Sequence, residues 1–224
     1  AGWPMGVARH PEGDLIVNDY WGHRIWRIDH EGILHLFGGD GIPGAEGDGG
    51  PVGDARFREP HDLHQDPRGN LYLSDLGNYT IRRIDYLTGI VTLVAGNGRR
   101  GRDGDGGPAV GACLIHVLCV AHGPDGSIYL GDAEVGRIRR IDAASGVIDT
   151  VAGTGLPGYD GDNGSAIRAR IGSPAAIRFD AAGCLYFADQ AFHVIRRVDP
   201  RGLITTVAGC GQTNSFCLAW QSGS

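Results

Sequence analysis

One of the four predicted inner strands begins with a histidine beside an aspartate, His61-Asp62, and both side chains are types that bind metal ions. A metal site needs several such ligands to complete its coordination shell. The segments that align with His61 carry Met5, Leu118 and Ala175 instead. We therefore expect a solvated or hydrogen-bonded polar position, with zinc binding as the alternative.

A second candidate is an aspartate that recurs at intervals of 56, 57 and 57 residues, as Asp19, Asp75, Asp132 and Asp189. Carboxylates can act as acids or bases, but catalysis needs one asymmetric arrangement and not four copies. We expect each aspartate either to brace the following turn or to pair with an arginine of its own repeat. The aligned arginines are Arg27, Arg83, Arg140 and Arg197.

Two acidic, glycine-rich stretches, 103–107 and 160–164, place oxygen ligands at alternate positions, as calcium loops do. Neither supplies the distal bidentate glutamate of an EF-hand, because that position holds Leu114 in the first stretch. The pattern favours aspartates that stabilise turns or cap helices, with calcium as the alternative.

The elements that position these residues repeat four times. Each recurring aspartate ends an apolar run such as Leu71-Tyr72-Leu73-Ser74, and five residues later a second run begins, such as 80–85. Two further runs complete four short strands per repeat. A fixed period built only from strands predicts an all-β fold, a β-propeller or array with one sheet, or blade, per repeat. The predicted blades cover 4–59, 60–116, 117–173 and 174–209, followed by an atypical tail, 210–224.

The linkers between blades are long and carry Gly47-Asp48-Gly49-Gly50-Pro51, Gly104-Asp105-Gly106-Gly107-Pro108 and a weaker third copy at 161–165. We interpret each as a glycine-rich turn that leads into one helical turn, with proline near its first position.

Three elements, GNLYLSDLGNYTIRRID, GIVTLVAGNG and GDGGPA, recur in this order and resemble NHL repeats over about residues 4–209. The resemblance implies a β-propeller, commonly of six blades, closed by pairing of the two chain ends. This chain has four repeats, so we expect either a small closed ring or an arc of a larger propeller. An arc would expose its end blades to self-association.

In such a blade, the loops between strands two and three lie on the same face as the linkers. We call this the long-loop face, and function is expected there. The candidate ligand-binding residues come from these loops and from the start of the inner strand. They are Tyr20, Trp21, His61, Asp62, Glu134, Phe192 and His193. The alternative for the loop rings is simple packing on the adjacent linker.

The stretch PHDLHQDPRGNLYLSD also resembles segments that supply zinc-binding histidines in peptidyl-hydroxyglycine lyases, which are propellers too. This resemblance implies a metal-assisted hydrolase or lyase with His61, Asp62 and Glu134 near the channel mouth. The missing histidines in the other repeats argue against it.

The formal net charge of −6 argues against nucleic acid as a partner. Arg99, Arg100 and Arg102 form the densest basic cluster and are the basis of an RNA-binding alternative. No apolar run approaches the length of a membrane span, so membrane insertion is not expected. The sequence starts at Ala1, and we expect an upstream segment that has been removed or left out.

The five cysteines are an odd number and follow no zinc or redox spacing. Cys113, Cys119 and Cys184 are interpreted as small apolar fillers, and Cys210 and Cys217 could pair in an oxidising compartment. The family resemblance favours an extracellular or periplasmic location.

The sequence therefore predicts a non-catalytic propeller that binds a protein or glycan through its long-loop face and needs no cofactor. The alternative is the metal-assisted hydrolase or lyase.

Overall fold

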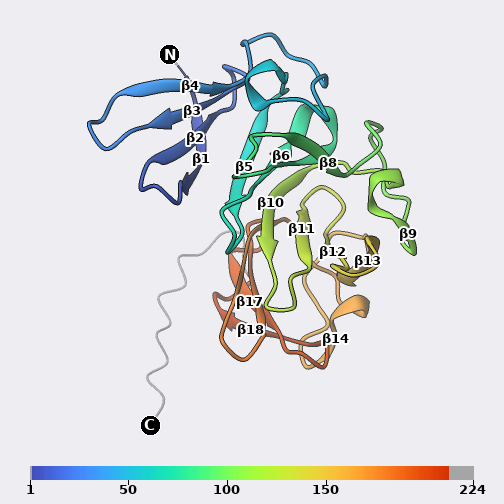
Figure 1. The fold of residues 1–224 in the computed structure, drawn as a ribbon. Coiled ribbons are helices and arrows are strands. Elements are labelled where there is room, and N and C mark those ends of the chain that lie inside the picture. The colour runs from blue at the N-terminus through green and yellow to red at the C-terminus, as the bar shows by residue number, and fades with distance from the viewer. Residues whose placement is uncertain (1, 212–224) are drawn as a thin grey trace.

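The computed structural model describes residues 2–211, which form four antiparallel sheets, here called blades 1 to 4 (Figure 1). Blade 1 contains β1 (Pro4–Arg9), β2 (Leu15–Asp19), β3 (Arg24–Ile28) and β4 (Leu34–Gly38). Blade 2 contains β5 (Pro60–Gln65), β6 (Leu71–Asp75), β7 (Thr80–Ile84) and β8 (Val91–Ala95). Blade 3 contains β10 (Val117–His122), β11 (Ile128–Asp132), β12 (Arg137–Ile141) and β13 (Val147–Ala152). Blade 4 contains β15 (Pro174–Phe179), β16 (Leu185–Asp189), β17 (Val194–Val198) and β18 (Leu203–Ala208). The prediction of an all-β fold with a four-stranded sheet in each repeat is confirmed.

Each linker reaches across to the outer strand of the following blade. In blades 3 and 4 it adds a fifth strand, β9 (Gly107–Pro108) beside β13 and β14 (Gly164–Ser165) beside β18, and in blade 2 Pro51 bridges Ile90. The predicted helical turn follows as a 3-10 turn in all three linkers, η1 (Val52–Asp54), η3 (Ala109–Gly111) and η4 (Ala166–Arg168). A further 3-10 turn, η2 (Leu76–Asn78), lies in the loop after β6.

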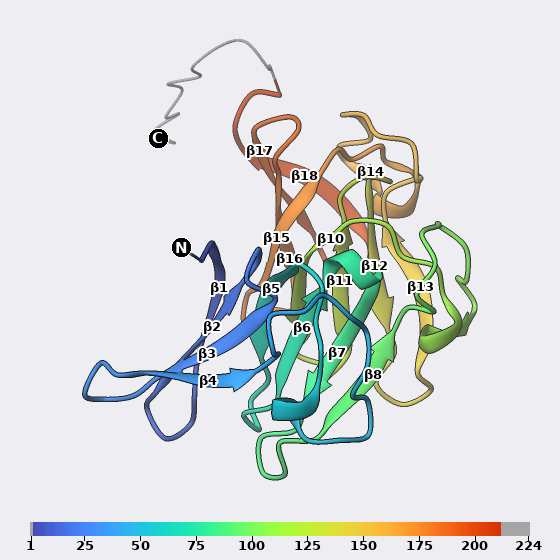
Figure 2. The same cartoon turned by 90° about the horizontal axis from the view of Figure 1, so that it is seen from above.

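The blades stack side by side, and their first strands follow one another in the order β1, β5, β10, β15 (Figure 2). The apolar core lies between neighbouring blades, where residues from two sheets and one linker meet, as for Ile16, Phe57 and Leu63. Burying both faces of a sheet requires apolar side chains on both sides of its strands, which is the pattern of β6 and β11.

Hydrogen bonds from polar side chains join the inner strands of neighbouring blades. The Asn18 side-chain amide donates to the carbonyl oxygen of Pro60 at 2.5 Å, and the Ser74 hydroxyl donates to that of Val117 at 2.6 Å. At the third junction Gly131 holds the equivalent position. There the Cys119 thiol contacts the carbonyl oxygen of Pro174 at 3.6 Å.

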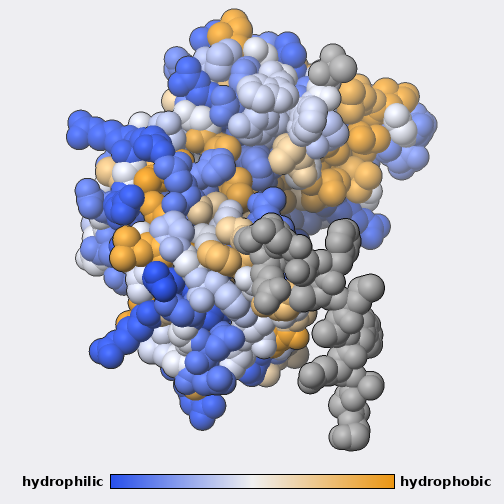
Figure 3. Space-filling view, turned by 180° about the vertical axis from the view of Figure 1, so that it is seen from behind, coloured by the Kyte–Doolittle hydropathy of each residue, from blue (hydrophilic) through white to orange (hydrophobic). Residues whose placement is uncertain are grey.

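The outer face of blade 1 is apolar and exposed. Val7 and Leu34 are exposed to solvent on this face. Apolar surface gathers over this blade at the upper right of Figure 3. The equivalent residues of blade 2, Leu63 and Val91, are buried against blade 1 and its linker. No described strand of blade 1 pairs with a described strand of blade 4.

Cys119 and Cys184 are buried and Cys113 is partly buried, all with free thiols. Cys210 is disulfide-bonded, whereas Cys217 and most of the predicted tail lie outside the described residues. Within residues 2–211, no helix has the length and apolar character needed to cross a membrane.

Candidate functional site

A pocket of about 160 Å³ lies on the long-loop face, where blades 1, 2 and 3 meet. Its polar and aromatic lining comes from three loops and two linkers: Tyr20, Glu59, Tyr79, Arg100, His116 and Glu134. We call it the mouth pocket. Two of the predicted binding residues, Tyr20 and Glu134, therefore line one cavity.

The loops that line the pocket share a backbone feature. The last residue before the third strand has positive φ in every blade, at His23, Tyr79, Gly136 and His193, with φ between 53° and 58°. This left-handed conformation turns the chain into the next strand and suits glycine. Only blade 3 uses glycine, so in the other blades the turn holds a bulky ring in a conformation that costs free energy.

Glu59 is the second strained residue of the pocket, with φ of 52° immediately before Pro60. Its amide donates to Nδ1 of His23 at 3.1 Å, and its Oε2 accepts the Tyr20 hydroxyl at 3.1 Å. Burial and the bond to Glu59 raise the pKa of Tyr20, so the phenol stays protonated and continues to donate. The two contacts hold the Glu59 carboxylate in a fixed place.

His61 lies behind Tyr20, with 6.0 Å between the ring centroids, and its Nδ1 lies 3.1 Å from the carbonyl oxygen of Leu118. Burial lowers the pKa of His61, so the ring is neutral near pH 7. A neutral ring against a carbonyl must carry its proton on Nδ1, which leaves Nε2 as an acceptor. His61 is thus a hydrogen-bonded residue next to the pocket.

Asp62 has a different hydrogen-bond partner from His61. Its carboxylate instead accepts the amide of Val120 at 2.8 Å and clasps blade 2 to blade 3. Burial raises the pKa of Asp62 above the ordinary range of an aspartate. Both side chains reach β10 of blade 3, where His61 contacts the carbonyl oxygen of Leu118 and Asp62 accepts the amide of Val120.

The rim of the pocket carries an exposed indole and an ion pair. Trp21 is 61% exposed and meets the edge of Tyr20 with 4.7 Å between centroids. Glu134 of blade 3 forms an ion pair with Arg100 of the linker before it. Arg100, from the basic cluster of the RNA-binding alternative, is therefore paired with an acidic side chain.

Phe192 and His193 lie on blade 4 and take no part in lining the mouth pocket. The Phe192 ring stacks on Tyr159 of the adjacent linker, with 5.7 Å between centroids. His193 lines a different cavity, beside Val194 and Ala208. The structure thus brings together Tyr20, Trp21, His61 and Glu134, and it leaves Phe192 and His193 apart.

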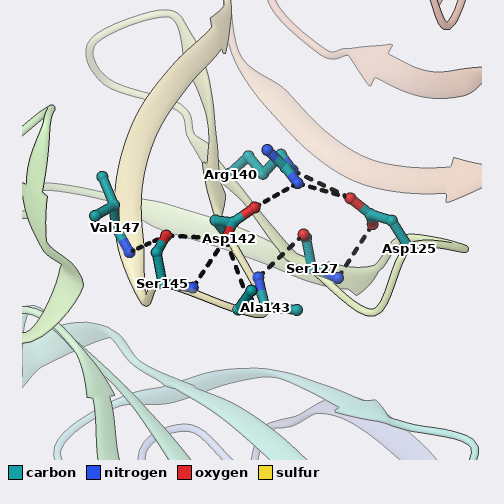
Figure 4. A network of polar contacts seen from close by, with 8 residues as sticks. Asp125, Ser127, Arg140, Asp142, Ala143, Ser145 and Val147 are labelled. Carbon is teal, nitrogen blue, oxygen red and sulfur yellow. Dashed lines mark hydrogen bonds and ion pairs between the residues drawn. The ribbon is translucent and has the colours of Figure 1, made fainter.

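The four recurring aspartates brace the chain and do not pair with the aligned arginines. Each accepts backbone amides from the segment that enters its blade, as Asp132 does from Ile115 and His116, and Asp189 from Gly172 and Ser173. Pairing with Arg27, Arg83, Arg140 and Arg197 is wrong, because these arginines lie toward the opposite face. Arg140, for example, bridges Asp125 and Asp142 at 2.9 and 2.8 Å (Figure 4).

The neighbouring arginine in each strand has the structural role that the sequence did not reveal. Arg82, Arg139 and Arg196 are buried and bind the linker before their own blade, each contacting the aspartate of the glycine-rich turn. Those aspartates are Asp48, Asp105 and Asp162. In the two stretches that resemble calcium loops, 103–107 and 160–164, the aspartate carboxylate therefore contacts the guanidinium group of a buried arginine. The constant spacing of 34 residues within each pair was the available signal.

A stacked histidine pair lies beyond the mouth pocket, where β5 meets β10. His64 and His122 lie 5.3 Å apart, and Nε2 of His64 accepts the amide of His122 at 3.2 Å. Burial and the neighbouring His122 lower the pKa of His64 to about 4. Within residues 2–211, no three His, Cys, Asp or Glu side chains are grouped so that they could share a metal ion.

Comparison with known proteins places this arrangement in a family. No family model matches the chain. It is 31% identical over 208 residues to SUPPRESSOR OF QUENCHING 1, chloroplastic, of Arabidopsis thaliana, covering 88% of this chain and 19% of that protein. It is 26% identical over 242 residues to NHL repeat-containing protein 2 of Bos taurus, covering 95% of this chain and 33% of that protein. The chain belongs to the NHL-repeat β-propeller family.

Solved structures agree with this NHL fold. Virginiamycin B lyase from Staphylococcus aureus matches with a TM-score of 0.58 and 18% identity, over 92% of this chain and 55% of the other. A chain of a nidogen/laminin complex matches with a TM-score of 0.64 and 16% identity, over 93% and 66%. At these identities the likeness concerns the fold. The NHL chain spans a third or less of the two curated relatives named above.

Proposed function

We propose that this NHL chain is a binding scaffold that recognises a protein through its long-loop face, with the mouth pocket and Trp21 as the point of contact. The observation that carries the proposal is the exposed indole of Trp21, set beside a cavity lined by tyrosine, glutamate and arginine. Tryptophan, tyrosine and arginine are the side chains that dominate binding energy at protein interfaces.

The free energy gained by burying Trp21 is large enough to contribute substantially to recognition of a partner. Burying the exposed part of the Trp21 indole in a complex contributes about 2–3 kcal/mol of favourable free energy. Tyr20 and Glu59 add polar groups that are already positioned, because the Tyr20 hydroxyl donates to the Glu59 carboxylate and the Glu59 amide donates to His23. Such preorganised groups lose little conformational entropy when a ligand binds.

Several observations favour binding over the metal-assisted hydrolase or lyase. His61 directs Nδ1 at a backbone carbonyl, and Asp62 is committed to the amide of Val120. Glu134 is paired with Arg100. The three residues of that alternative therefore have separate partners. One similar chain comes from a nidogen/laminin complex, which is a complex between proteins.

The proposal includes an open arrangement of the four blades, as an arc of a larger propeller. The exposed apolar surface of blade 1 supports an arc, because closure onto blade 4 would cover Val7 and Leu34. Light scattering combined with small-angle scattering tests this part. A compact ring-shaped monomer would contradict the arc, and an elongated curved particle or a dimer would agree with it.

The binding proposal is tested with peptides selected from a phage-displayed random library on the immobilised chain. The affinity of one selected peptide is then measured by calorimetry for the wild type, for Trp21→Ala and for Glu59→Gln. Leu87→Ala is the control, because Leu87 is an exposed apolar residue on the opposite, short-turn face.

We expect Trp21→Ala to weaken binding at least about tenfold and Leu87→Ala to leave it unchanged. Equal affinities for Trp21→Ala and the wild type would refute the proposed site. A parallel glycan array tests the other ligand class, and binding there that depends on Trp21, without any peptide binding, would replace protein by glycan.

A further inference from the structure

The mouth pocket is small, on the scale of one amino-acid side chain. Its volume is about 160 Å³, whereas pockets for cofactors and other small molecules usually measure about 300–1,000 Å³. The rings of Tyr20 and Tyr79 and the apolar side chains of Leu76 and Ile115 line it, together with polar groups. Such a lining suits a side chain that has an aliphatic stem and a polar tip.

Glu59 leaves one negative charge uncompensated in this lining. The lining also contains Glu134 and Arg100, but these two form an ion pair with each other. Glu59 is partly buried and forms no ion pair among residues 2–211, and its one described side-chain bond is from the Tyr20 hydroxyl to Oε2. A carboxylate in this setting attracts a cation and repels an anion. The mouth pocket therefore has the charge of a site for a positively charged group.

The two tyrosine rings of the pocket also favour a cation. The face of a tyrosine ring attracts ammonium and guanidinium groups, and more strongly where water is excluded. Tyr20 is held by its bond to Glu59 at 3.1 Å and by its edge contact with Trp21. Tyr79 lies in the left-handed turn before β7, with φ of 56°, and its amide donates to the carbonyl oxygen of Leu76 at 3.1 Å. Both rings are thus in place before a ligand arrives.

The hydrogen bonding of Glu59 favours an ammonium group over a guanidinium. A guanidinium pairs most strongly through two parallel bonds to both oxygens of a carboxylate. In Glu59 one oxygen, Oε2, already accepts the Tyr20 hydroxyl, whereas no described donor contacts Oε1. An ammonium is a compact point charge, and one carboxylate oxygen with neighbouring ring faces can hold it. Lysine joins this group to the flexible aliphatic stem that the apolar part of the lining suits.

We infer that the mouth pocket binds the ammonium group of a lysine side chain presented by the partner protein, with Glu59 as its counter-charge and the rings of Tyr20 and Tyr79 beside it. This inference rests on the proposed function, since it specifies what the same pocket recognises. The 224 residues contain no lysine, so a second copy of this chain cannot supply the side chain. The formal net charge of −6 favours the approach of a basic partner.

The probe for the test is the peptide acetyl-Gly-Gly-Lys-Gly-Gly-amide, titrated into the isotope-labelled full chain. The backbone amide signals of Gly77, Tyr79 and His116, which line the pocket, are followed by NMR. Three control peptides replace the lysine by norleucine, by arginine or by glutamate. Norleucine keeps the aliphatic stem and removes the charge, so it isolates the contribution of the ammonium group.

Two protein variants locate the bound lysine. Glu59→Gln removes the charge from the pocket and keeps a side-chain oxygen for the Tyr20 hydroxyl. Glu31→Gln is the matched control, because Glu31 lies on an exposed turn of blade 1 away from the pocket. The amide signals of blade 4 serve as the check that each variant is folded.

We expect saturable shifts with the lysine peptide, with half-saturation below about 10 mM, and at least about tenfold weaker binding of the norleucine and glutamate peptides. Glu59→Gln should weaken binding of the lysine peptide about tenfold, and Glu31→Gln should leave it unchanged. Equal binding of the lysine and norleucine peptides by the wild type would overturn the inference. Tighter binding of the arginine or the glutamate peptide would overturn it as well.

Failure of this inference is distinguishable from failure of the proposed function. If the short peptides show no dependence on lysine while Trp21→Ala still weakens a library-selected peptide, the binding face stands and the lysine inference is overturned. If the short peptides bind through lysine while Trp21→Ala has no effect on the selected peptide, the lysine inference is supported and Trp21 is not the point of contact.

Discussion

Arg139 and Arg140 are neighbours in β12 and point to opposite sides of the sheet, so they form a matched pair for testing how the blades are held together. Arg139 is 1% exposed, and its Nε donates to Asp105 at 2.8 Å and its Nη1 to the carbonyl oxygen of Cys113 at 2.9 Å. Arg140 has a side chain that is 33% exposed and bridges two carboxylates near the solvent.

Replacing Arg139 by alanine removes the buried partner of Asp105 and leaves the carbonyl oxygen of Cys113 without its hydrogen bond. Breaking a buried pair in this way costs about 3–5 kcal/mol. The carboxylate of Asp105 is partly exposed and keeps a 2.6 Å bond from the Thr150 hydroxyl, so part of the loss is recovered. We expect a loss of about 3 kcal/mol in the free energy of unfolding for Arg139→Ala. The expected loss for Arg140→Ala is about 1 kcal/mol or less.

The assay is urea unfolding followed by far-ultraviolet circular dichroism, at about 0.15 M and about 1 M salt. High salt should shrink the effect of Arg140→Ala and leave that of Arg139→Ala nearly unchanged, because a buried pair is screened less. Arg139→Lys retains the charge without the forked geometry and should fall between wild type and Arg139→Ala. If Arg139→Ala costs no more than Arg140→Ala, the buried arginines do not hold the linkers.

Three further predictions use equilibrium unfolding. Ile148→Ala should lower the free energy of unfolding by about 2–4 kcal/mol. Leu34→Ala, at the equivalent position of blade 1, should lower it by less than about 1 kcal/mol, because Leu34 is 54% exposed. Equal losses would mean that the outer face of blade 1 is covered. Asn18→Ala should lower the free energy of unfolding by about 2 kcal/mol, because it leaves the Gly6 amide and the Pro60 carbonyl without a partner. An unchanged stability would show that these hydrogen bonds do not hold blades 1 and 2 together. The folded pKa of His64, about 4, lies below its ordinary 6.5, so the unfolded chain is protonated first and stability is lost as the pH falls from about 6.5 to about 4. His64→Gln should lose less stability over this range, and an unchanged pH dependence would contradict the assignment.

The repeat was predictable because local signals produced it. Short apolar runs, recurring turn glycines and the fixed spacing of Asp19 to Asp189 each point to the same four-stranded unit. The pairing of the repeated aspartates with Arg83 and Arg140 failed for a geometric reason. Adjacent arginines in a strand point to opposite faces, and only the path of the linker decides which one is buried.

The site was predictable in part. Loop position identified Tyr20, Trp21 and Glu134, but which loops meet depends on how the blades stack, and Phe192 and His193 lie apart from these residues on blade 4. Glu59 and Tyr79 were missed because a left-handed conformation at a residue other than glycine leaves no mark in the sequence.

The most direct test of the central claim is the calorimetric affinity of one selected peptide for Trp21→Ala relative to Leu87→Ala. The two side chains are exposed on opposite faces of the molecule. A loss of about tenfold or more confined to Trp21→Ala is the predicted result. Equal affinities for the two variants would place binding away from the long-loop face and would contradict the proposed function.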